Sequence, residues 1–430
     1  MKSGTFFIDT YGCKINQSES QAIREGWLRA GFRETENPGD AEYIIINSCA
    51  VTSKAERDAR NALYRHKREA PDAKIILSGC ASRLFKNFVP RKDGNWTRPD
   101  IFGTNRDLVS PPGPINSASP VSELFAPLST YKRGRPVIKI QDGCSQGCAY
   151  CIIPFLRGKP VSRHPEEILA ECRRLLAAGF GELVISGINL ALYRSPDGGN
   201  YWRLLAWLDE ELSREFAGQA RLRTSSIDPS QLTDEALEVL ERGKMLCPHL
   251  HLSLQHASPW ILKSMRRPGY DIASVAGRLG RVRTFWPRMG LGADLIAGFP
   301  GESERDVEIL LDSIPSLGLT YAHIFPYSAR PGTRAASMSQ QVPLAEKKRR
   351  AELARRAVDN EKNKFLASMI GRQCVVAPDA GNDEGGATRG VNEYYIQCEI
   401  AGDRTFPPMG LARALAIATS PRGLIVEPGL

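Results

Sequence analysis

Three cysteines fall within residues 144–151 of this 430-residue chain, in the sequence Cys144-Ser-Gln-Gly-Cys148-Ala-Tyr-Cys151. Thiolates are soft ligands that suit iron–sulfur clusters or zinc, and four ligands would normally close such a site. A cluster held by three cysteines leaves one iron open to a substrate or cofactor. Zinc prefers paired Cys-x-x-Cys units, and no second pair or Cys/His partner follows at a finger-like distance. The spacing therefore favours an iron–sulfur cluster over zinc.

A second set of three cysteines lies in the first hundred residues. Cys13, Cys49 and Cys80 each follow, within a few residues, a short run of β-branched or aromatic residues. The intervals between them are about the length of one βα unit, so the thiols should lie at the carboxyl ends of neighbouring parallel strands, where open α/β sheets bind ligands. The alternative is three unrelated buried cysteines. Gly12 and Gly79 mark turns rather than core, so we expect the three thiols to converge on one point.

The elements that position these cysteines follow from the apolar runs. Runs at 5–8, 43–46 and 74–77 alternate with helical stretches, which predicts a parallel α/β sheet. Six further runs recur with helices between them, at 137–140, 183–185, 221–225, 250–254, 291–296 and 321–325. A closed eight-unit barrel would need more chain, so we expect a partial barrel of six βα units with active residues at the strand ends.

The length of the chain predicts two or three domains, of the α/β class overall. We expect an N-terminal α/β domain at 1–106, a Pro- and Ser-rich linker at 107–135, a partial barrel with a basic C-terminal helix at 136–366 and a small β-barrel at 370–430. The net charge of +9 favours a polyanionic partner or simply a basic soluble protein. Sparse cysteines, no signal-peptide pattern and no long apolar run favour a reducing cytoplasm and exclude membrane insertion.

The first cysteine motif carries a resemblance to a known family. The pattern Cys-x-x-x-Cys-x-aromatic-Cys resembles the signature of the radical S-adenosylmethionine enzymes, and residues 152–163 are similar to the methylthiotransferase branch. Within that branch the chain resembles, over nearly its whole length, the bacterial tRNA enzymes that act on threonylcarbamoyladenosine beside the anticodon. The resemblance implies S-adenosylmethionine and two [4Fe–4S] clusters, one at each cysteine set. The sequence Cys80-Ala-Ser-Arg departs from the family, which more often has an aromatic residue and a glutamine there.

The resemblance also implies which residues contact S-adenosylmethionine. All but one of them follow a predicted barrel strand, and the remaining one is the aromatic residue of the cluster motif. They are Tyr150, Ser186, Gly187, Asn189, Ser225, Ser226, Gln255 and Gly298. Glycine at such positions allows close approach of the backbone to a ligand. No catalytic residue is expected beyond the cluster ligands.

Five other side chains have competing or simpler interpretations. Arg157 and Arg163 bind either the cofactor carboxylate or a tRNA phosphate, because a guanidinium suits both. His256 stands where the family more often has serine, and a local hydrogen-bonding role is favoured for it. Cys172 and Cys247 lie in apolar surroundings and are predicted to belong to the core.

The tail after residue 370 resembles the TRAM domain, an RNA-binding barrel. Tyr394 and Tyr395 either stack on RNA bases or belong to the core of this barrel. The helical run at 344–366 is rich in lysine and arginine, for which a solvated charged face is the default interpretation.

The resemblance implies a methylthiotransferase. One cluster would reduce S-adenosylmethionine to give a radical that abstracts hydrogen from a purine carbon, and the auxiliary cluster would deliver sulfur. Residues 223–228 and 323–333 favour threonylcarbamoyladenosine at tRNA position 37 as the substrate. The alternatives are isopentenyladenosine in tRNA, an aspartate of a ribosomal protein or, in a different class, a non-catalytic iron–sulfur protein that binds RNA. Expected partners are the tRNA anticodon stem-loop and a flavodoxin- or ferredoxin-like electron donor, and the protein is expected to be a monomer.

Overall fold

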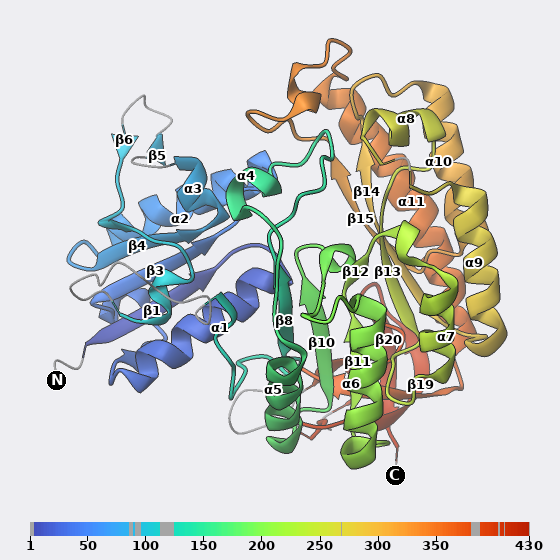
Figure 1. Cartoon of the computed structure of the whole chain (residues 1–430), viewed down its shortest axis with the longest axis horizontal. Helices are drawn as coiled ribbons and strands as arrows, with labels where there is room; N and C mark the ends of the chain where they lie inside the picture. The colour runs from blue at the N-terminus through green and yellow to red at the C-terminus, as the bar shows by residue number, and fades with distance from the viewer. Residues whose placement is uncertain are drawn as a thin grey trace.

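The computed structural model describes residues 4–85, 89–90, 96–111, 124–267, 269–379, 388–402, 405–407 and 409–429. Its sheets form an N-terminal α/β domain, a central open barrel and a closed C-terminal β-barrel (Figure 1). The mixed α/β fold predicted from the sequence is confirmed. Among the described residues, no helix is both long and apolar enough to cross a membrane.

The N-terminal sheet is parallel, as predicted. Its strands run in the order β2 (Arg33–Glu34), β1 (Thr5–Thr10), β3 (Tyr43–Ser48), β4 (Lys74–Gly79) and β7 (Ile101–Phe102). Helices α1 (Lys14–Arg29) and α2 (Ser53–Glu69) cover its two faces (Figure 1). Ile45 packs with Trp27 of α1, whereas Ile44 and Ile46 pack with Leu63 of α2. This alternation explains why β3 is apolar at successive positions, since both of its faces are buried.

The central domain has six parallel strand units arranged in two half-sheets. The first contains β8 (Val137–Asp142), β10 (Glu182–Gly187) and β11 (Arg221–Thr224), with the short antiparallel β9 (Val161–Ser162) beside β8. The second contains β12 (Ser226–Ile227), β13 (His249–Gln255), β14 (Gly290–Ala297) and β15 (Tyr321–Pro326). The chain passes from one half-sheet to the other at Ser225. The predicted partial barrel of six units is confirmed.

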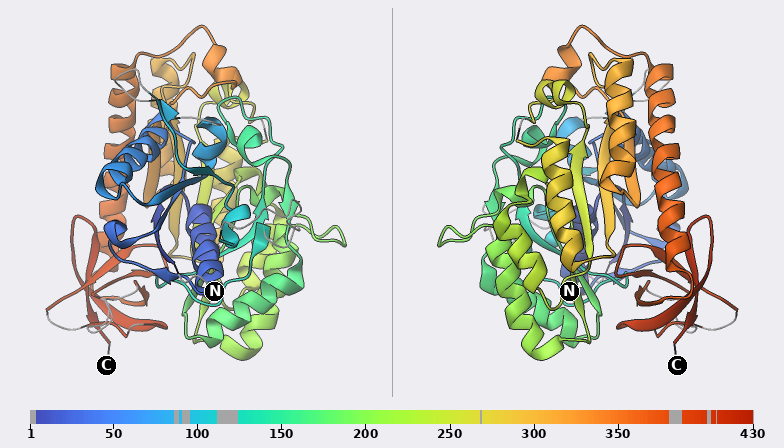
Figure 2. Two further views of the ribbon diagram at one scale, coloured as in Figure 1. Left: turned by 90° about the vertical axis from the view of Figure 1, so that its left-hand side faces the viewer. Right: turned by 90° about the vertical axis from the view of Figure 1, so that its right-hand side faces the viewer.

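Helices cover the outside of this barrel (Figures 1 and 2). They are α5 (Pro165–Ala177), α6 (Tyr201–Phe216), α7 (Asp234–Arg242), α8 (Pro259–Ser264), α9 (Ile272–Phe285) and α10 (Glu304–Leu317). Polar side chains cap the N-termini of most of these helices. Helix α10, for example, begins with a capping box between Ser303 and Asp306. Cys172 and Cys247 are buried in the domain, as predicted for core residues.

Helix α11 (Leu344–Met369) runs along the central domain and leads into the C-terminal barrel (Figure 2). The barrel closes through β16 (Gln373–Pro378), β17 (Arg389–Asn392), β18 (Gln397–Ile400), β20 (Gly423–Pro428) and β19 (Ala412–Thr419). The predicted small β-barrel is confirmed. On α11, Arg349, Arg350 and Arg356 each pair with a glutamate, so much of the basic charge of this helix is neutralised within the protein.

The C-terminal barrel contacts the base of the central barrel through Tyr395. Its ring stacks on His249 at 4.9 Å between centroids and lies 5.2 Å from the ring of Tyr321. Tyr394 packs edge-on against Phe365 at 5.9 Å. Neither interpretation fits Tyr395, because its half-buried ring packs between the two barrels rather than in the core of the small one. The core interpretation fits Tyr394, which packs against that core.

Part of the predicted linker, residues 112–123, lies outside the described residues. Residues 124–135 pack closely on both neighbouring domains: Leu128 is buried in the barrel core, and Glu25 of α1 accepts hydrogen bonds from the backbone N–H and the hydroxyl of Ser129 at 3.0 and 2.7 Å. This part of the segment therefore packs between the two domains it connects. The domain boundaries themselves stay a prediction.

Candidate functional site

The cysteine motif at 144–151 forms a loop at the carboxyl end of β8. Gly143 has a φ of +72°, which turns the chain out of the strand, and a Cβ there would collide with the carbonyl of Lys159. The Cys144 Sγ accepts hydrogen bonds from the backbone N–H of Gln146 at 3.4 Å and from Nδ2 of Asn189 at 3.5 Å. The loop is thus fixed against the next strand end, where Asn189 lies.

The second cysteine set converges as predicted. Cys13 precedes α1, Cys49 follows β3 and Cys80 begins α3 (Cys80–Phe85). Burial, together with the neighbouring thiols of Cys80 and Cys13, raises the pKa of the Cys49 thiol to about 12. Gly12, with a φ of +108°, permits this approach, because a Cβ there would lie 2.7 Å from the Cβ of Cys49. All three thiols therefore gather at one edge of the sheet.

The surroundings of both cysteine sets suit thiolates that are bound to a metal. Burial raises the pKa of Cys148, of Cys80 and, to about 12, of Cys151. Thiols in such surroundings are protonated near neutral pH unless a cation compensates the charge of the thiolate. Iron in a cluster would provide that compensation.

The spacing of the thiols fits clusters better than single zinc ions. Within the part of the chain that the structure describes, three or more His, Cys, Asp or Glu ligand atoms lie within 4.8 Å of one another at one place only, which contains no cysteine. Thiolates on one tetrahedral zinc would stand about 3.8 Å apart, given Zn–S bonds of about 2.3 Å. A four-iron cluster binds each thiolate through a different iron and so spaces them more widely.

A cavity of about 280 Å³ lies between the two cysteine sets. Val51 and Thr52, which follow Cys49, line it on one side, and Tyr150 and Cys151 line it on the other. Gln255, at the end of β13, also lines it and has a φ of 63°, which is uncommon for a residue with a side chain and costs about 1–3 kcal/mol. Two of the predicted cofactor contacts, Tyr150 and Gln255, thus face one space.

The other predicted cofactor contacts lie at strand ends as expected, but none of them lines this cavity. Ser186 and Gly187 end β10, and Ser225 and Ser226 lie where the chain crosses between the half-sheets. Gly298 follows β14. A Cβ there would collide with Lys347 of α11, so this loop is pressed against the helix. Contact of these residues with S-adenosylmethionine stays a prediction.

Arg267 is a site residue that the sequence did not predict. Its Nη1 lies 3.9 Å from the Cys148 Sγ, and its Nη2 donates to Asp228 and to the carbonyl of Ser253, both at 2.8 Å. Arg267 thus places a buried positive charge beside a thiolate ligand and fixes it with Asp228. The sequence offered an indication of this site through Asp228, the partner of Arg267. Asp228 follows the end of a predicted strand, as the other site residues do.

The two alternatives considered for Arg157 are both wrong. Its guanidinium is buried between domains, pairing with Glu19 of α1 at 2.8 Å and with Asp142 of β8 at 3.2 Å. Lys139 pairs with the same two carboxylates, at 2.8 and 2.6 Å. Burial opposes the charged form of Glu19, but Arg157 and Lys139 outweigh it and hold the pKa of this carboxyl far below its usual value. These groups bind the N-terminal domain to the barrel.

Arg163 and His256 are likewise internal. Arg163 is buried and pairs with Glu171 at 2.7 Å, so it is not free for a ligand either. His256 accepts a hydrogen bond at Nδ1 from the N–H of Ser258 at 3.0 Å, and its Nε2 lies 3.5 Å from Glu302. Its favoured interpretation as a local hydrogen-bonding residue fits this geometry.

Comparisons with known proteins agree with this site. Residues 5–95 match the family described as "Uncharacterized protein family UPF0004", and residues 138–314 match the "Radical SAM superfamily". The solved structure of the methyltransferase TsrM from Kitasatospora setae superposes with a TM-score of 0.53 at 12% identity, covering 78% of this chain and 77% of that one. This likeness shows a shared fold.

The curated relatives are more specific. The threonylcarbamoyladenosine tRNA methylthiotransferase MtaB of Thermotoga maritima is 32% identical over 93% of this chain and 92% of its own length. The MtaB of Chlamydia pneumoniae is 36% identical over 84% and 85%. The tRNA-2-methylthio-N(6)-dimethylallyladenosine synthase of Jannaschia is 29% identical over 93% and 88%. S-adenosylmethionine and two [4Fe–4S] clusters are the cofactors of this group. The chain belongs to the MtaB family of radical S-adenosylmethionine tRNA methylthiotransferases.

Proposed function

We propose that this enzyme adds a methylthio group to C2 of N6-threonylcarbamoyladenosine at tRNA position 37, just 3′ of the anticodon. The observation that carries the proposal is the single cavity that loops of both cysteine sets line. The relatives that carry the name of this substrate are 32% and 36% identical over most of the chain, whereas the Jannaschia dimethylallyladenosine enzyme is 29% identical.

The two cysteine sets have different roles in the proposed reaction. Cys144, Cys148 and Cys151 would hold the cluster that binds S-adenosylmethionine, and the set that contains Cys49 would hold the auxiliary cluster. When bound, these groups supply the hydrogen-abstracting radical at one side of the cavity and sulfur at the other. Arg267 stabilises the negative charge at Cys148, because its guanidinium faces that sulfur.

The protein positions the base and excludes water. Phe325, at the end of β15, lines the cavity and is 42% exposed, so its ring offers a stacking surface for a purine. The loop at Val51 and Thr52 covers the same space from the N-terminal domain, which keeps bulk water from the reacting carbon. A base in a single-stranded anticodon loop can be splayed into this cavity without breaking a duplex.

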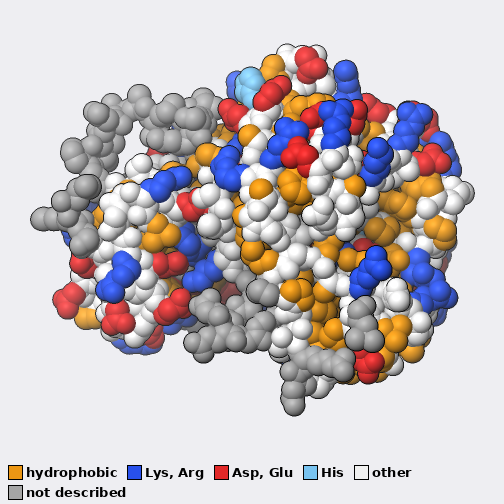
Figure 3. Space-filling model, turned by 90° about the horizontal axis from the view of Figure 1, so that it is seen from below, with side chains coloured by type: hydrophobic (Ala, Val, Ile, Leu, Met, Phe, Trp, Pro, Cys, Tyr) orange, Lys and Arg blue, Asp and Glu red, His pale blue; other side chains and the backbone are white. Residues whose placement is uncertain are grey.

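The remaining partners follow from the same proposal. The net charge of +9 attracts a tRNA, although Lys and Arg side chains on the lower face are interspersed with Asp and Glu rather than gathered in one patch (Figure 3). The enzyme recognises the anticodon stem-loop, receives electrons from a flavodoxin- or ferredoxin-like protein, and works as a monomer in the cytoplasm.

The decisive experiment compares two tRNAs. Reconstituted enzyme, S-adenosylmethionine and a reductant are incubated with threonylcarbamoyl-bearing tRNA and, separately, with isopentenyl-bearing tRNA. Mass spectrometry of the nucleosides should show methylthiolation of the first only. Methylthiolation of the second alone would overturn the substrate, and modification of neither, with active cofactor cleavage, would overturn tRNA methylthiolation as the reaction.

A further inference from the structure

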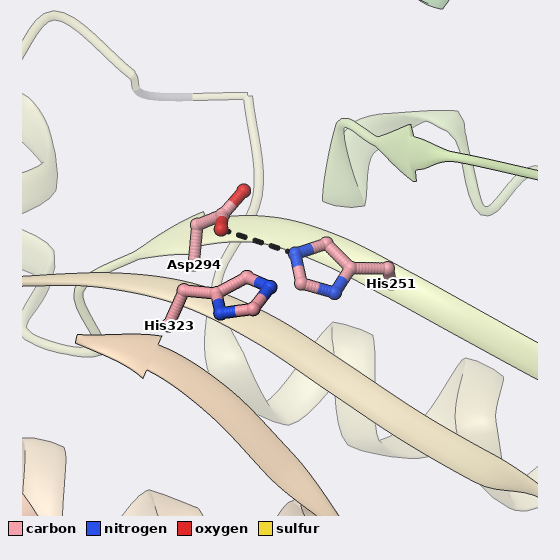
Figure 4. Close-up of side chains that lie close together, drawn as sticks. All are labelled: His251, Asp294 and His323. Atoms are coloured by element: carbon pink, nitrogen blue, oxygen red, sulfur yellow. Dashed lines mark ion pairs between the residues drawn. The ribbon is translucent and has the colours of Figure 1, made fainter. Parts of the chain in front are cut away.

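A cluster of polar side chains on three barrel strands contains no cysteine. It consists of His251 on β13, Asp294 on β14 and His323 on β15 (Figure 4). The register pairs Asp294 with His323, and β13 flanks β14 on its other side, so the three side chains extend from adjacent strands to the same face. Their ligand atoms lie within 4.8 Å of one another, and Nε2 of His251 is 3.1 Å from Oδ1 of Asp294.

Further hydrogen bonds fix the ring of His251. The hydroxyl of Tyr321 lies 2.8 Å from Nδ1 of His251 and 2.8 Å from Nε2 of His249. Histidines that bind a metal through one ring nitrogen usually have the other nitrogen hydrogen-bonded, which sets the tautomer and the orientation of the ring. Tyr321 meets that requirement, and its own ring is held by the stack of His249 and Tyr395.

We propose that His251, Asp294 and His323 bind one divalent first-row transition-metal ion. Two imidazoles and one carboxylate are a common donor set for such ions. Ligand atoms that share an ion at about 2.0–2.2 Å stand about 3–4 Å apart, which is the separation of His251 and Asp294. His323 is exposed, and its ligand atom lies within 4.8 Å of those of His251 and Asp294.

The ion would keep positions open toward the substrate cavity. Asp294 is one of the residues that line the space between the cysteine sets, so an ion on its carboxylate borders that space. An oxygen or nitrogen donor of a bound substrate could then complete the coordination. The iron of the two clusters is unaffected, because no cysteine takes part.

The positive charge of Lys14 opposes the ion. Nζ of Lys14 lies 5.2 Å from the centroid of the Tyr395 ring, and the charge of Lys14 acts on both Asp294 and His323. Like charges repel, so removal of this amino group should strengthen metal binding. If the cluster only formed hydrogen bonds, Lys14 would have no effect on a metal.

Mn²⁺ is the appropriate probe. It prefers oxygen and nitrogen ligands and competes poorly for thiolates, so it leaves the clusters intact. Reconstituted enzyme with both clusters is titrated with Mn²⁺, and the electron paramagnetic resonance signal of the free ion reports the bound fraction. We expect one site per chain, and the Lys14→Met variant should bind Mn²⁺ several-fold more tightly.

Variants decide the assignment. His323→Gln, chosen because the side chain is exposed and its loss should not disturb folding, is expected to weaken binding by at least tenfold, as is Asp294→Asn. The matched control is His164→Gln, an exposed histidine at the start of α5. Iron content and thermal unfolding confirm that each variant is folded. Equal Mn²⁺ binding by the wild type and His323→Gln, or no binding by the wild type, would overturn the proposal.

Discussion

Replacing Arg223 with methionine tests how the C-terminal barrel is attached to the central one. The guanidinium is completely buried, and it donates to Glu182 at 2.7 Å and to the backbone carbonyls of Asn392 and Glu393 at 2.9 and 3.0 Å. Methionine keeps an apolar stem of similar length but removes every donor. Glu182 is also buried and retains Arg221, which lies 2.6 Å away.

The expected loss follows from these contacts. Arg223 and Glu182 both belong to the central barrel, so the hydrogen bonds of Arg223 that cross to the tail are the two to the carbonyls of Asn392 and Glu393. A hydrogen bond to a charged group contributes about 1.5–3 kcal/mol. We therefore expect the free energy of docking to fall by about 3 kcal/mol when both are lost. Since 1.4 kcal/mol corresponds to a factor of ten, the undocked population should rise about 100-fold.

Native-state proteolysis measures this population. Cleavage near Ile370, between α11 and β16, tracks the open form when opening and closing are fast. Thermolysin should therefore cut Arg223→Met about 100-fold faster than the wild type. Arg356→Met is the matched control, because this arginine is exposed and pairs only with Glu352 of its own helix at 3.3 Å. Equal cleavage rates for the two variants would refute the argument that Arg223 holds the tail.

Three further predictions concern the clusters and acid stability. Gly12→Ala should lower the iron content of reconstituted protein from about eight to about four per chain, whereas Gly31→Ala, also at positive φ but with no atom within 4 Å, should retain it. Cys49→Ala should still produce 5′-deoxyadenosine but no methylthio product, as nucleoside and cofactor analysis would show; loss of both from folded protein would contradict separate roles. Burial raises the pKa of Glu182, but Arg223 outweighs it and the net pKa is far below 4.5. Its contribution to stability is thus present above pH 4.5 and lost as pH falls through the lower folded value, so acid unfolding of Glu182→Gln, followed by circular dichroism, should be less steep than that of the wild type.

The sequence predicted the positions of the cysteines because parallel sheets impose a simple rule. The carboxyl ends of parallel strands share one edge, so residues that follow successive strands meet there whatever separates them along the chain. Cys13, Cys49 and Cys80 obeyed this rule, as did Asn189 and Gln255 in the barrel. This prediction needed only the spacing of the apolar runs along the chain, because burial of the strands makes each run apolar.

The roles of Arg157 and Tyr395 could not be predicted in the same way. The partner of Arg157, Glu19, lies 138 positions earlier in the chain, and a guanidinium binds a protein carboxylate as readily as a cofactor carboxylate or a phosphate. Tyr395 adopts a φ of 66°, which lets its ring turn out of the small barrel and under the large one. Neither the pairing of Arg157 with Glu19 nor the contact of Tyr395 with the large barrel produces a local pattern in the sequence.

Arg157 and Arg223 have a common consequence. Arg157 joins the N-terminal domain to the mouth of the central barrel through the buried Glu19. Arg223 joins the tail to the base of that barrel through the backbone carbonyls of Asn392 and Glu393. A buried ion pair contributes little net stability compared with apolar packing, but a mispaired one is costly, so it selects a single arrangement of the parts it joins. The first pair lies beside Cys80, whose pKa Arg157 lowers against the effect of burial. The separation of the two cysteine sets across the cavity is therefore set by the same side chains that dock the domains, which is what transfer between two fixed groups requires.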